Sequence, residues 1–368
     1  MKKICVYAIS KNESQFVERW YNSIKEADLI IVGDTGLSDD TVEKLKKLGV
    51  KVYIIKVNPW RFDEARNKVL KHIPKDIDIC LSMDLDEIIT EGWKEKMIEA
   101  WNDDTTRLKY NYNWSFDEYG KPAVSFLIEK THSRKNYKWT HPVHEVLVYT
   151  DTNNEKIDRA TGFEINHYPD LKKSRSNYLP FLELSVEEDP EDDRNRHYLG
   201  REYMYNRMWD KSISTLKKHL ELKKAIWRDE RCASMRYISR CYKEQNNYYE
   251  AREWAYKAIA EAPYVREPYV EMALLEYKQQ NWPAVYHMCT EALKIKNRST
   301  SYINESSCWN STIFDLASIS CYHLGMLENA LNFSNEAIKL DPKNERLIGN
   351  NGLYKKTMVE IMRKKNVA

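Results

Sequence analysis

The stretch Ile4-Cys-Val-Tyr-Ala-Ile9 is a short apolar run that predicts a buried β-strand. An amphipathic stretch that predicts a helix, Glu13 to Ile24, follows it, and then a second apolar run, Leu29 to Val32. The alternation continues with two more predicted helices and two more predicted strands: Asp39–Leu48, Lys51–Val57, Asp63–His72 and Ile77–Met83. This order is typical of a parallel sheet with helices on its faces, and such sheets bind ligands at the carboxyl ends of their strands.

The region from Leu108 to Val148 is aromatic and rich in β-forming residues, which predicts antiparallel strands added to the sheet. Its first part carries rings at mostly alternating positions: Tyr110, Tyr112, Trp114, Phe116 and Tyr119. Alternation places such rings on one face of a strand. That face could serve core packing, or it could be a platform for a bound substrate.

After about Pro180 helical periodicity replaces the strand pattern. Small residues and prolines recur there in spacing: Ala251, Ala258 and Pro263 match Ala330, Ala337 and Pro342, and Ala292 follows Ala258 by 34 residues. Thirty-four residues is the tetratricopeptide period, so we expect about four repeats with an insertion around residues 297–310. The predicted parts are an α/β domain over residues 1–175, a connection over 176–195 and all-α helical repeats over 196–368.

The composition fits a globular protein of 368 residues. Its net charge is +2, with Lys and Arg spread along the chain, so charge alone gives no argument for nucleic-acid binding. Its seven cysteines are dispersed and lack a C-x-x-C spacing, so we expect reduced thiols in a cytoplasmic protein. No stretch reaches the roughly 20 apolar residues of a membrane span. The first apolar run ends at Lys11, too early for a signal peptide.

The sequence Asp84-Leu-Asp86 directly follows the predicted strand that ends at Met83. Two aspartates at the carboxyl end of a strand can face one divalent cation and a ribose. Carboxylate oxygens are preferred ligands of Mg²⁺ and Mn²⁺, which neutralise a diphosphate. An Asp-x-Asp sequence alone also occurs in ordinary solvated turns, so its neighbours decide its meaning.

Polar residues also follow the other predicted strands, and the carboxyl ends of parallel strands meet at one edge of a sheet. With Asp84, we assign these residues to the binding of a nucleotide-sugar donor: Ala8, Ser10, Lys11, Glu13, Asp34, Arg61, Arg66 and Asn67. Asp34 can accept hydrogen bonds from a nucleobase. The cationic side chains can offset phosphate charge.

These motifs resemble glycosyltransferase family 2, of the GT-A fold, in order and spacing. The resemblance covers about residues 3 to 170 and rests on four motifs: Lys11-Asn12-Glu13, Asp34-Thr35-Gly36 with Ser38-Asp39, Arg66-Asn67, and Asp84-Leu85-Asp86. It implies a Rossmann-like mixed sheet, a UDP-sugar or a similarly activated donor, Mn²⁺ or Mg²⁺ as cofactor, and usually inversion at the anomeric carbon.

The resemblance also implies an acidic residue at the head of the acceptor site and a later histidine at the metal. Glu145, in Trp139-Thr-His-Pro-Val-His144-Glu145, is the corresponding general base, and His167 would complete a metal shell with Asp84 and Asp86. The family more often shows an Asp preceded by another acid, whereas His144 precedes Glu145 here. His144 is therefore a candidate for assisting the base, binding phosphate or replacing His167 as the ligand.

The helical repeats narrow the resemblance to bacterial and phage transferases in which a GT-A domain precedes tetratricopeptide repeats, a group that implies homodimers formed through the repeats. We predict a metal-dependent, inverting hexosyltransferase that moves a sugar from a UDP-sugar to a macromolecular acceptor. A peptide or protein is the first choice of acceptor, with a glycan or a modified DNA base as alternatives. The competing hypothesis is a catalytically inactive scaffold that binds protein partners.

Overall fold

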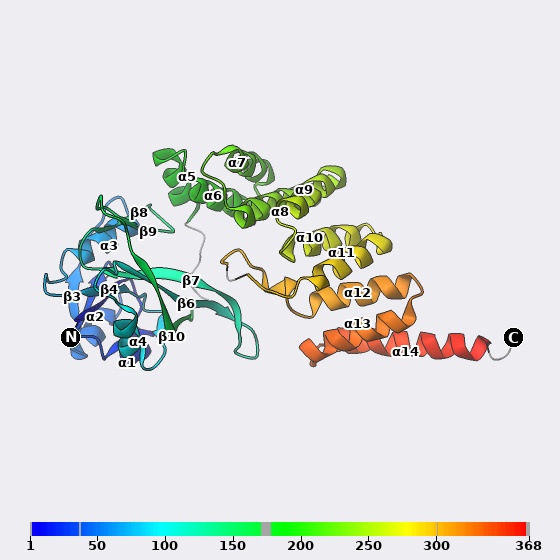
Figure 1. Cartoon of the computed structure of the whole chain (residues 1–368), viewed down its shortest axis with the longest axis horizontal. Coiled ribbons are helices and arrows are strands. Elements are labelled where there is room, and N and C mark those ends of the chain that lie inside the picture. The colour runs from blue at the N-terminus through cyan, green and yellow to red at the C-terminus, as the bar shows by residue number, and fades with distance from the viewer. Residues whose placement is uncertain (1, 37, 171–177, 300, 366–368) are drawn as a thin grey trace. The chain divides into compact units, whose positions relative to one another are not determined.

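The computed structural model describes residues 2–36, 38–170, 178–299 and 301–365. Contacts within the chain define a sheet unit, residues 1–189 with 300–302, and a helical unit, residues 190–299 with 303–368. Figure 1 shows the strands in the first part of the chain and helices alone in the second. The predicted boundary at residues 175 and 176 lies outside the described residues. The predicted start of the repeats, residue 196, falls inside helix α6 (Asp193–Tyr205).

The sheet unit contains an eight-stranded mixed sheet and a separate two-stranded hairpin. The order in the sheet is β3-β2-β1-β4-β7-β6-β10-β5, and the hairpin is β8-β9. The strands are β1 (Ile4–Ser10), β2 (Leu29–Asp34), β3 (Lys51–Ile54), β4 (Ile79–Ser82), β5 (Glu87–Ile89), β6 (Arg107–Phe116), β7 (Pro122–Ser133), β8 (Tyr137–Thr140), β9 (Val146–Tyr149) and β10 (Ile157–His167). The helices are α1 (Val17–Ile24), α2 (Thr41–Lys47), α3 (Phe62–Leu70), α4 (Trp93–Ala100) and α5 (Leu179–Glu188).

The sheet changes character at β4. Strands β3, β2, β1 and β4 are parallel neighbours, as the alternation of the first 83 residues predicts. Beyond β4, β7 is antiparallel to both β4 and β6, while β10 is parallel to β6 and antiparallel to β5. The predicted Rossmann-like mixed sheet is confirmed. Strands β5 and β10 lie outside the segments that the sequence pattern predicts.

Strand β1 is buried on both faces, which explains its continuous apolar run. Ile4, Val6 and Ala8 face a core shared with α1, α2 and α4. Cys5 and Tyr7 face a second core shared with α3 and the β8-β9 hairpin. The sheet is therefore a middle layer, and the ends of β1, β2 and β4 are held from both sides.

The helical unit consists of nine α-helices within the described residues, together with the 3-10 helix η1 (Ser306–Cys308). The α-helices are α6 (Asp193–Tyr205), α7 (Trp209–Glu221), α8 (Arg228–Glu244), α9 (Tyr248–Glu261), α10 (Glu267–Lys278), α11 (Trp282–Lys294), α12 (Thr312–His323), α13 (Leu327–Leu340) and α14 (Glu345–Lys365). None of the described helices combines the length and the apolar character that crossing a membrane requires.

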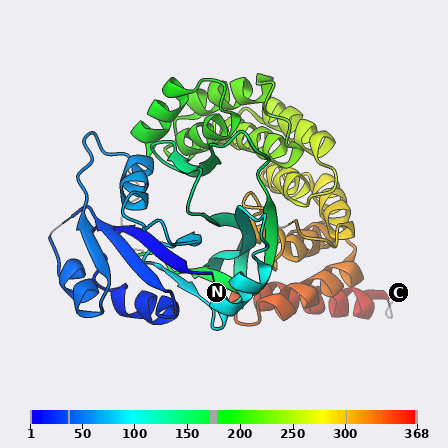
Figure 2. The ribbon, with the colours of Figure 1, turned by 60° about the vertical axis from the view of Figure 1, so that its left-hand side comes forward.

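The helices pack as consecutive pairs, α6 with α7, α8 with α9, α10 with α11 and α12 with α13. Figure 2 shows these pairs stacked side by side in a curved array. The first residues of α9 and α11, Tyr248 and Trp282, lie 34 positions apart, and four pairs match the four expected repeats. A Cβ on Gly200 of α6 would lie 2.5 Å from the side chain of Leu216 in α7, so this pair closes around a residue without a side chain. The array resembles tetratricopeptide repeats.

All seven cysteines are free and buried, in agreement with the expectation of reduced thiols. Two lie in the sheet unit, Cys5 and Cys80, and five lie in the helical unit: Cys232, Cys241, Cys289, Cys308 and Cys321. Burial raises the pKa of each of these thiols. They are packing residues, because a protonated thiol is neither a good nucleophile nor a metal ligand.

A buried histidine, His132 of β7, is held neutral in the core of the sheet unit. Its Nδ1 donates to the carbonyl of Ser133 at 2.8 Å, so Nε2 accepts from the hydroxyl of Tyr7, also at 2.8 Å. The Tyr7 oxygen in turn accepts from the indole of Trp139 at 2.9 Å. Desolvation lowers the pKa of His132 to about 3, so the imidazole stays uncharged well below neutral pH.

We expect this histidine to make the sheet unit acid-sensitive. Its folded pKa lies below the unfolded value of 6.5, so its contribution to stability is complete above pH 6.5 and is lost as pH falls toward 3. The loss approaches about 1.4 kcal/mol per pH unit. Denaturant unfolding at several values between pH 7 and 5 should give a shallower pH slope for His132→Gln than for the wild type. Parallel slopes would mean that His132 is not the responsible group.

Candidate active site

Arg66 lies at the centre of the carboxyl edge of the sheet. It belongs to α3, which packs closely on β2 because Gly33 has no side chain there; a Cβ on Gly33 would collide with Val69 of α3. The Arg66 side chain is buried, 6% exposed, and reaches across the end of β4. The close packing of α3 on β2 thus fixes the Arg66 guanidinium beside the Asp84-Leu85-Asp86 motif.

The guanidinium of Arg66 binds two carboxylates at once. Its Nη2 donates to Oδ2 of Asp84 at 3.0 Å, and its Nη1 lies 2.8 Å from Oδ1 of the same residue. Its Nε donates to Oε1 of Glu145 at 2.6 Å, and Nη1 also donates to Ser82 Oγ at 3.1 Å. Glu145 and Asp84, which lie 79 and 18 positions from Arg66 in the sequence, therefore contact the same guanidinium.

Lys130 of β7 is a second cation at this edge, and sequence reasoning missed it. Its Nζ lies 3.1 Å from Oε1 of Glu87 and 3.4 Å from Oδ2 of Asp84. Glu87 is buried and also accepts from the Tyr112 hydroxyl at 2.6 Å and, through Oε2, from the backbone N–H of Asp84 at 2.8 Å. A lone lysine in a β-rich stretch is usually a surface residue, so no pattern in the sequence identifies it.

Arg66 and Lys130 affect the pKa values of two neighbouring carboxylates, Asp84 and Glu87. Burial alone would raise the pKa of Asp84, but the Arg66 guanidinium and the Lys130 ammonium outweigh it and hold that pKa well below its usual range. For Glu87 the balance is reversed, because desolvation raises its pKa more than Lys130 lowers it. Asp84 is therefore a fixed anion, and Lys130 offsets part of the cost of burying the Glu87 carboxylate.

This interaction gives a testable stability effect. We expect Lys130→Met to lower the free energy of unfolding by about 3 kcal/mol, since it leaves the buried Glu87 carboxylate without its charged partner. Lys47→Met is the matched control, because Lys47 forms an exposed pair with Glu43 at 2.7 Å and should have little effect in denaturant unfolding. Adding Glu87→Gln to Lys130→Met should recover part of the loss. A double variant no more stable than Lys130→Met would contradict this account.

Asp86 and His167 form a separate donor pair beside this network. Nε2 of His167, at the end of β10, lies 3.3 Å from Oδ2 of Asp86. Nδ1 of His167 donates to the carbonyl of Trp114 at 3.0 Å, which directs Nε2 toward Asp86. Desolvation would lower the pKa of His167, but the Asp86 carboxylate raises it overall. The rings of His167 and Trp114 stack with centroids 4.4 Å apart, so aromatic packing also fixes the orientation of this histidine.

The Asp86 carboxylate suits Mn²⁺ or Mg²⁺, which favour oxygen ligands and complete their shells with water and substrate phosphates, and the His167 nitrogen is a second donor beside it. The predicted third ligand is placed differently, because Asp84 is engaged by Arg66 and Lys130. Among the described residues, Asp84, Asp86 and His167 do not bring three ligand atoms within 4.8 Å of one another. The structure thus pairs two of the three predicted ligands.

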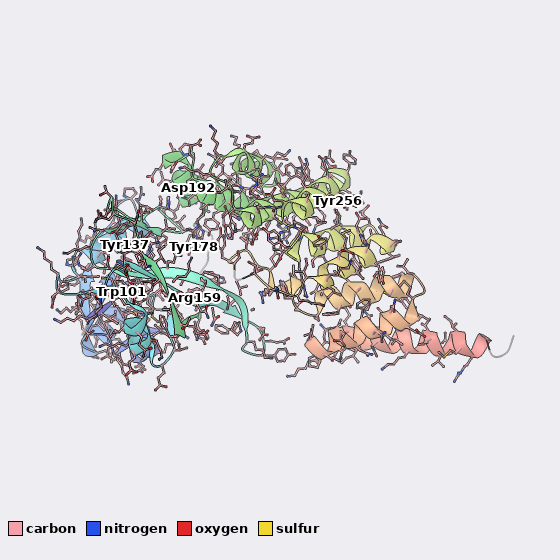
Figure 3. The ribbon with its side chains drawn as sticks, viewed as in Figure 1. Trp101, Tyr137, Arg159, Tyr178, Asp192 and Tyr256 are labelled. Carbon is pink, nitrogen blue, oxygen red and sulfur yellow. The ribbon has the colours of Figure 1, made fainter. Side chains whose placement is uncertain are left out.

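Glu145 stands at the end of a strained turn between β8 and β9. His141 and His144 have φ values of +78° and +51°, a backbone region that residues other than glycine seldom adopt. Such strain costs of the order of 1 to 3 kcal/mol per residue and is common at functional sites. Trp139 anchors the β8-β9 hairpin in the core. Figure 3 labels Tyr137, the first residue of the hairpin. His144 lies beside Glu145 in the turn, with its ring 5.9 Å from that of Tyr178.

The loop after β1 and the end of β2 form the remaining part of the site. Asp34 is fully buried, and its carboxylate accepts from Ser10 Oγ at 2.7 Å and from the backbone N–H of Gly36 at 3.1 Å. Burial raises the pKa of Asp34 despite these bonds. The stem of Lys11 lies against Gly36, and Glu13 is tied to α2 through a 2.9 Å bond from its N–H to Thr41 Oγ1. Asp34 thus organises both loops.

Three residues predicted to bind the donor are placed elsewhere. Ala8 lies in the middle of β1 with its side chain in the core. The Asn67 amide bonds the backbone N–H and carbonyl of Trp139 at 2.9 and 2.8 Å, so it holds β8 against α3. Arg61 is bound by Asp63 and Glu188, which use its guanidinium. We leave these three residues out of the proposed site.

Sequence comparison relates part of this unit to a known family. Residues 5–154 match the sequence profile described as Glycosyl transferase family 2. This range includes both aspartates of the motif, Arg66 and Glu145. The sheet unit is therefore similar to family 2 glycosyl transferases over this range.

Curated relatives carry the same class name. A protein of Rickettsia bellii described as an uncharacterized glycosyltransferase is 35% identical over 97 residues, which are 26% of this chain and 32% of the relative. A protein of Rickettsia prowazekii with the same description is 34% identical over 98 residues, 26% of this chain and 32% of the relative. The chain thus spans about a third of the length of these curated relatives.

Two solved structures are similar to about half of the chain. YrrB, described as a TPR protein with an unusual peptide-binding site, matches 48% of this chain and 83% of its own, with a TM-score of 0.39 and 14% identity. MamA matches 49% of this chain and 99% of its own, with a TM-score of 0.38 and 14% identity.

Proposed function

We propose that the chain is a metal-dependent glycosyltransferase that moves a sugar from a nucleoside-diphosphate sugar to a macromolecular acceptor. The observation that carries the proposal is the juxtaposition, within a unit similar to family 2 glycosyl transferases, of the Asp86–His167 donor pair and the Arg66 bridge between Asp84 and Glu145. One part suits a cation and the other a general base. Both lie at the edge of the sheet where such folds bind ligands.

Asp86 and His167 would hold Mn²⁺ or Mg²⁺, with His144 as the alternative to His167. When bound, the ion would neutralise the charge of the departing diphosphate. Lys11 is the exposed cation of the β1 loop and would offset further phosphate charge, while Ser10, Glu13 and Asp34 would shape the nucleoside end of the donor site. We place UDP first among the nucleotides.

Glu145 would act as the general base. Its Oε1 is bound by Arg66, so Oε2 would accept the proton of the acceptor hydroxyl or thiol. The acceptor oxygen or sulfur forms a bond to the anomeric carbon, the bond from that carbon to the diphosphate oxygen breaks, and the electron pair leaves with the nucleoside diphosphate. Attack from the side opposite the leaving group would invert the anomeric centre. Arg66 would keep Glu145 in place.

The aromatic strand β6 divides between the two roles considered for it. Tyr110 and Tyr112 are buried in the core, whereas Trp114 is 39% exposed and stacks on His167. Phe116 stacks on Tyr168, with centroids 5.2 Å apart and planes inclined by 6°. We therefore propose Trp114 as the platform for a sugar or acceptor group. The helical unit would contribute the surface for a peptide or protein acceptor and for a homodimer of a cytoplasmic protein.

The test is a screen of the purified full chain against UDP-, GDP- and TDP-sugars, each with Mn²⁺, Mg²⁺ or EDTA. A ligand that binds only the folded state raises the melting temperature by mass action, and calorimetry then gives the affinity. The proposal expects one nucleotide sugar to stabilise the chain only when metal is present. If none binds under any condition, the proposal fails and the competing scaffold hypothesis takes its place.

A further inference from the structure

A histidine and two carboxylates meet where the first three helices of the helical unit join. Asp193 is the first residue of α6, His219 lies in the last turn of α7, and Glu230 lies in the first turn of α8. One ligand atom from each lies within 4.8 Å of the other two, and this is the one such group among the described residues. Figure 3 labels Asp192, the N-cap residue directly before Asp193.

The His219 ring is oriented toward this group. It is fully buried, and its Nδ1 lies 2.9 Å from the hydroxyl of Ser234. Its Nε2 is buried and has no hydrogen-bond partner within the described residues. A buried polar nitrogen without a partner costs about 1 to 3 kcal/mol, so its position needs an explanation. The atom that it faces is Oε1 of Glu230, at 3.4 Å.

The spacing of these atoms fits a metal ion better than a direct hydrogen bond. Zn²⁺ binds imidazole nitrogen and carboxylate oxygen at about 2.0 to 2.2 Å, usually with tetrahedral geometry, which places two ligand atoms roughly 3.3 Å apart. The observed separation of 3.4 Å between His219 and Glu230 matches this value. A hydrogen bond between nitrogen and oxygen is shorter, about 2.7 to 3.2 Å.

The surroundings of His219 also suit a metal ligand. A ligating histidine generally donates its other N–H to a neighbouring group, which fixes the ring. Ser234 Oγ can accept from Nδ1 of His219 while it donates to Nδ1 of His197, 2.8 Å away. This order of donation leaves Nε2 of His219 as a lone pair facing the carboxylates.

We propose that Asp193, His219 and Glu230 form a binding site for a divalent transition-metal ion, with Zn²⁺ as the best fit. One imidazole and two carboxylates are common zinc ligands, whereas Mg²⁺ and Ca²⁺ favour oxygen alone. Asp193 is only partly buried, so water can reach the ion from its side and complete the shell. The ion would tie α6, α7 and α8 together at the start of the repeat array.

The experiment measures zinc binding to the full chain after chelator treatment. It is done in the Asp86→Ala background, which removes one of the two paired donors in the sheet unit. The expected result is one Zn²⁺ per chain by calorimetry and metal analysis, with a melting temperature raised by about 5 to 10 °C at a hundredfold excess over Kd. No step of the proposed sugar transfer uses this site, so the outcome is independent of that proposal.

Two added variants separate this site from incidental surface binding. Asp193→Asn keeps the size of a partly exposed side chain and should weaken zinc binding by at least about tenfold, as loss of one ligand does. Glu221→Gln removes an exposed carboxylate of the same helix as His219 and should bind zinc like the background. Circular dichroism checks that the helices of both variants remain folded, and His219→Gln repeats the test at a second ligand. Equal zinc affinity in Asp193→Asn and Glu221→Gln, or no bound zinc, would overturn the proposal.

Discussion

Replacing Asp86 with alanine is expected to abolish turnover, lowering the transfer rate by on the order of a thousandfold or more. Asp86 is one of the two donors that face the proposed cation, and a bound metal ion contributes several kcal/mol to the stabilisation of a departing phosphate. His167 alone would hold the ion weakly. The measurement is the steady-state rate with the donor found in the binding screen, across a titration of Mn²⁺ and Mg²⁺.

Asp103→Ala is the matched control, because Asp103 is an exposed aspartate of the same unit. This variant should keep wild-type rates and the same dependence on metal. Wild-type rates in Asp86→Ala with metal present would remove Asp86 from the metal site.

Glu145→Gln should leave donor binding intact and reduce transfer by on the order of a hundredfold or more, the usual loss when a general base is removed. Glutamine keeps the shape of the side chain and an oxygen that can still accept from Arg66. It cannot take the acceptor proton. The donor affinity comes from calorimetry and the transfer rate from single-turnover kinetics, so that the two effects are measured separately.

The matched control is Glu155→Gln, which makes the same chemical change in a different arginine pair, Arg107 with Glu155 at 2.8 Å. It should leave both donor affinity and transfer unchanged. If Glu145→Gln weakens donor binding as much as it slows transfer, the role of Glu145 is to position Arg66 and not to act as the base.

The first half of the fold follows directly from local patterns. Each apolar run before residue 83 became a parallel strand. Strands β1 and β4 are continuous apolar runs because the sheet buries them on both faces. Residues at the ends of these strands therefore had to share an edge, and this is why Asp34 and Ser10 are in contact. The helix pairs were equally predictable, since small residues recur wherever two helices approach closely.

The site itself depended on contacts that spacing does not reveal. Sequence reasoning gave Arg61 and Arg66 the same role, but Arg61 is bound by Glu188, 127 residues away, while Arg66 lies under the acidic motif. Lys130 comes to Asp84 only because β7 pairs with β4 in antiparallel register. Long-range partners of charged side chains decide such roles, and residue type alone does not specify them.

Because all seven cysteines are buried, we expect the native chain not to react with alkylating reagents, which modify exposed thiolates. Each thiol becomes reactive only when its surroundings open. A brief pulse of a maleimide during unfolding, followed by peptide mass spectrometry, would mark Cys5 and Cys80 when the sheet unit opens and the other five cysteines when the helical unit opens. The cysteines of the wild-type chain thus report the order in which its two units unfold.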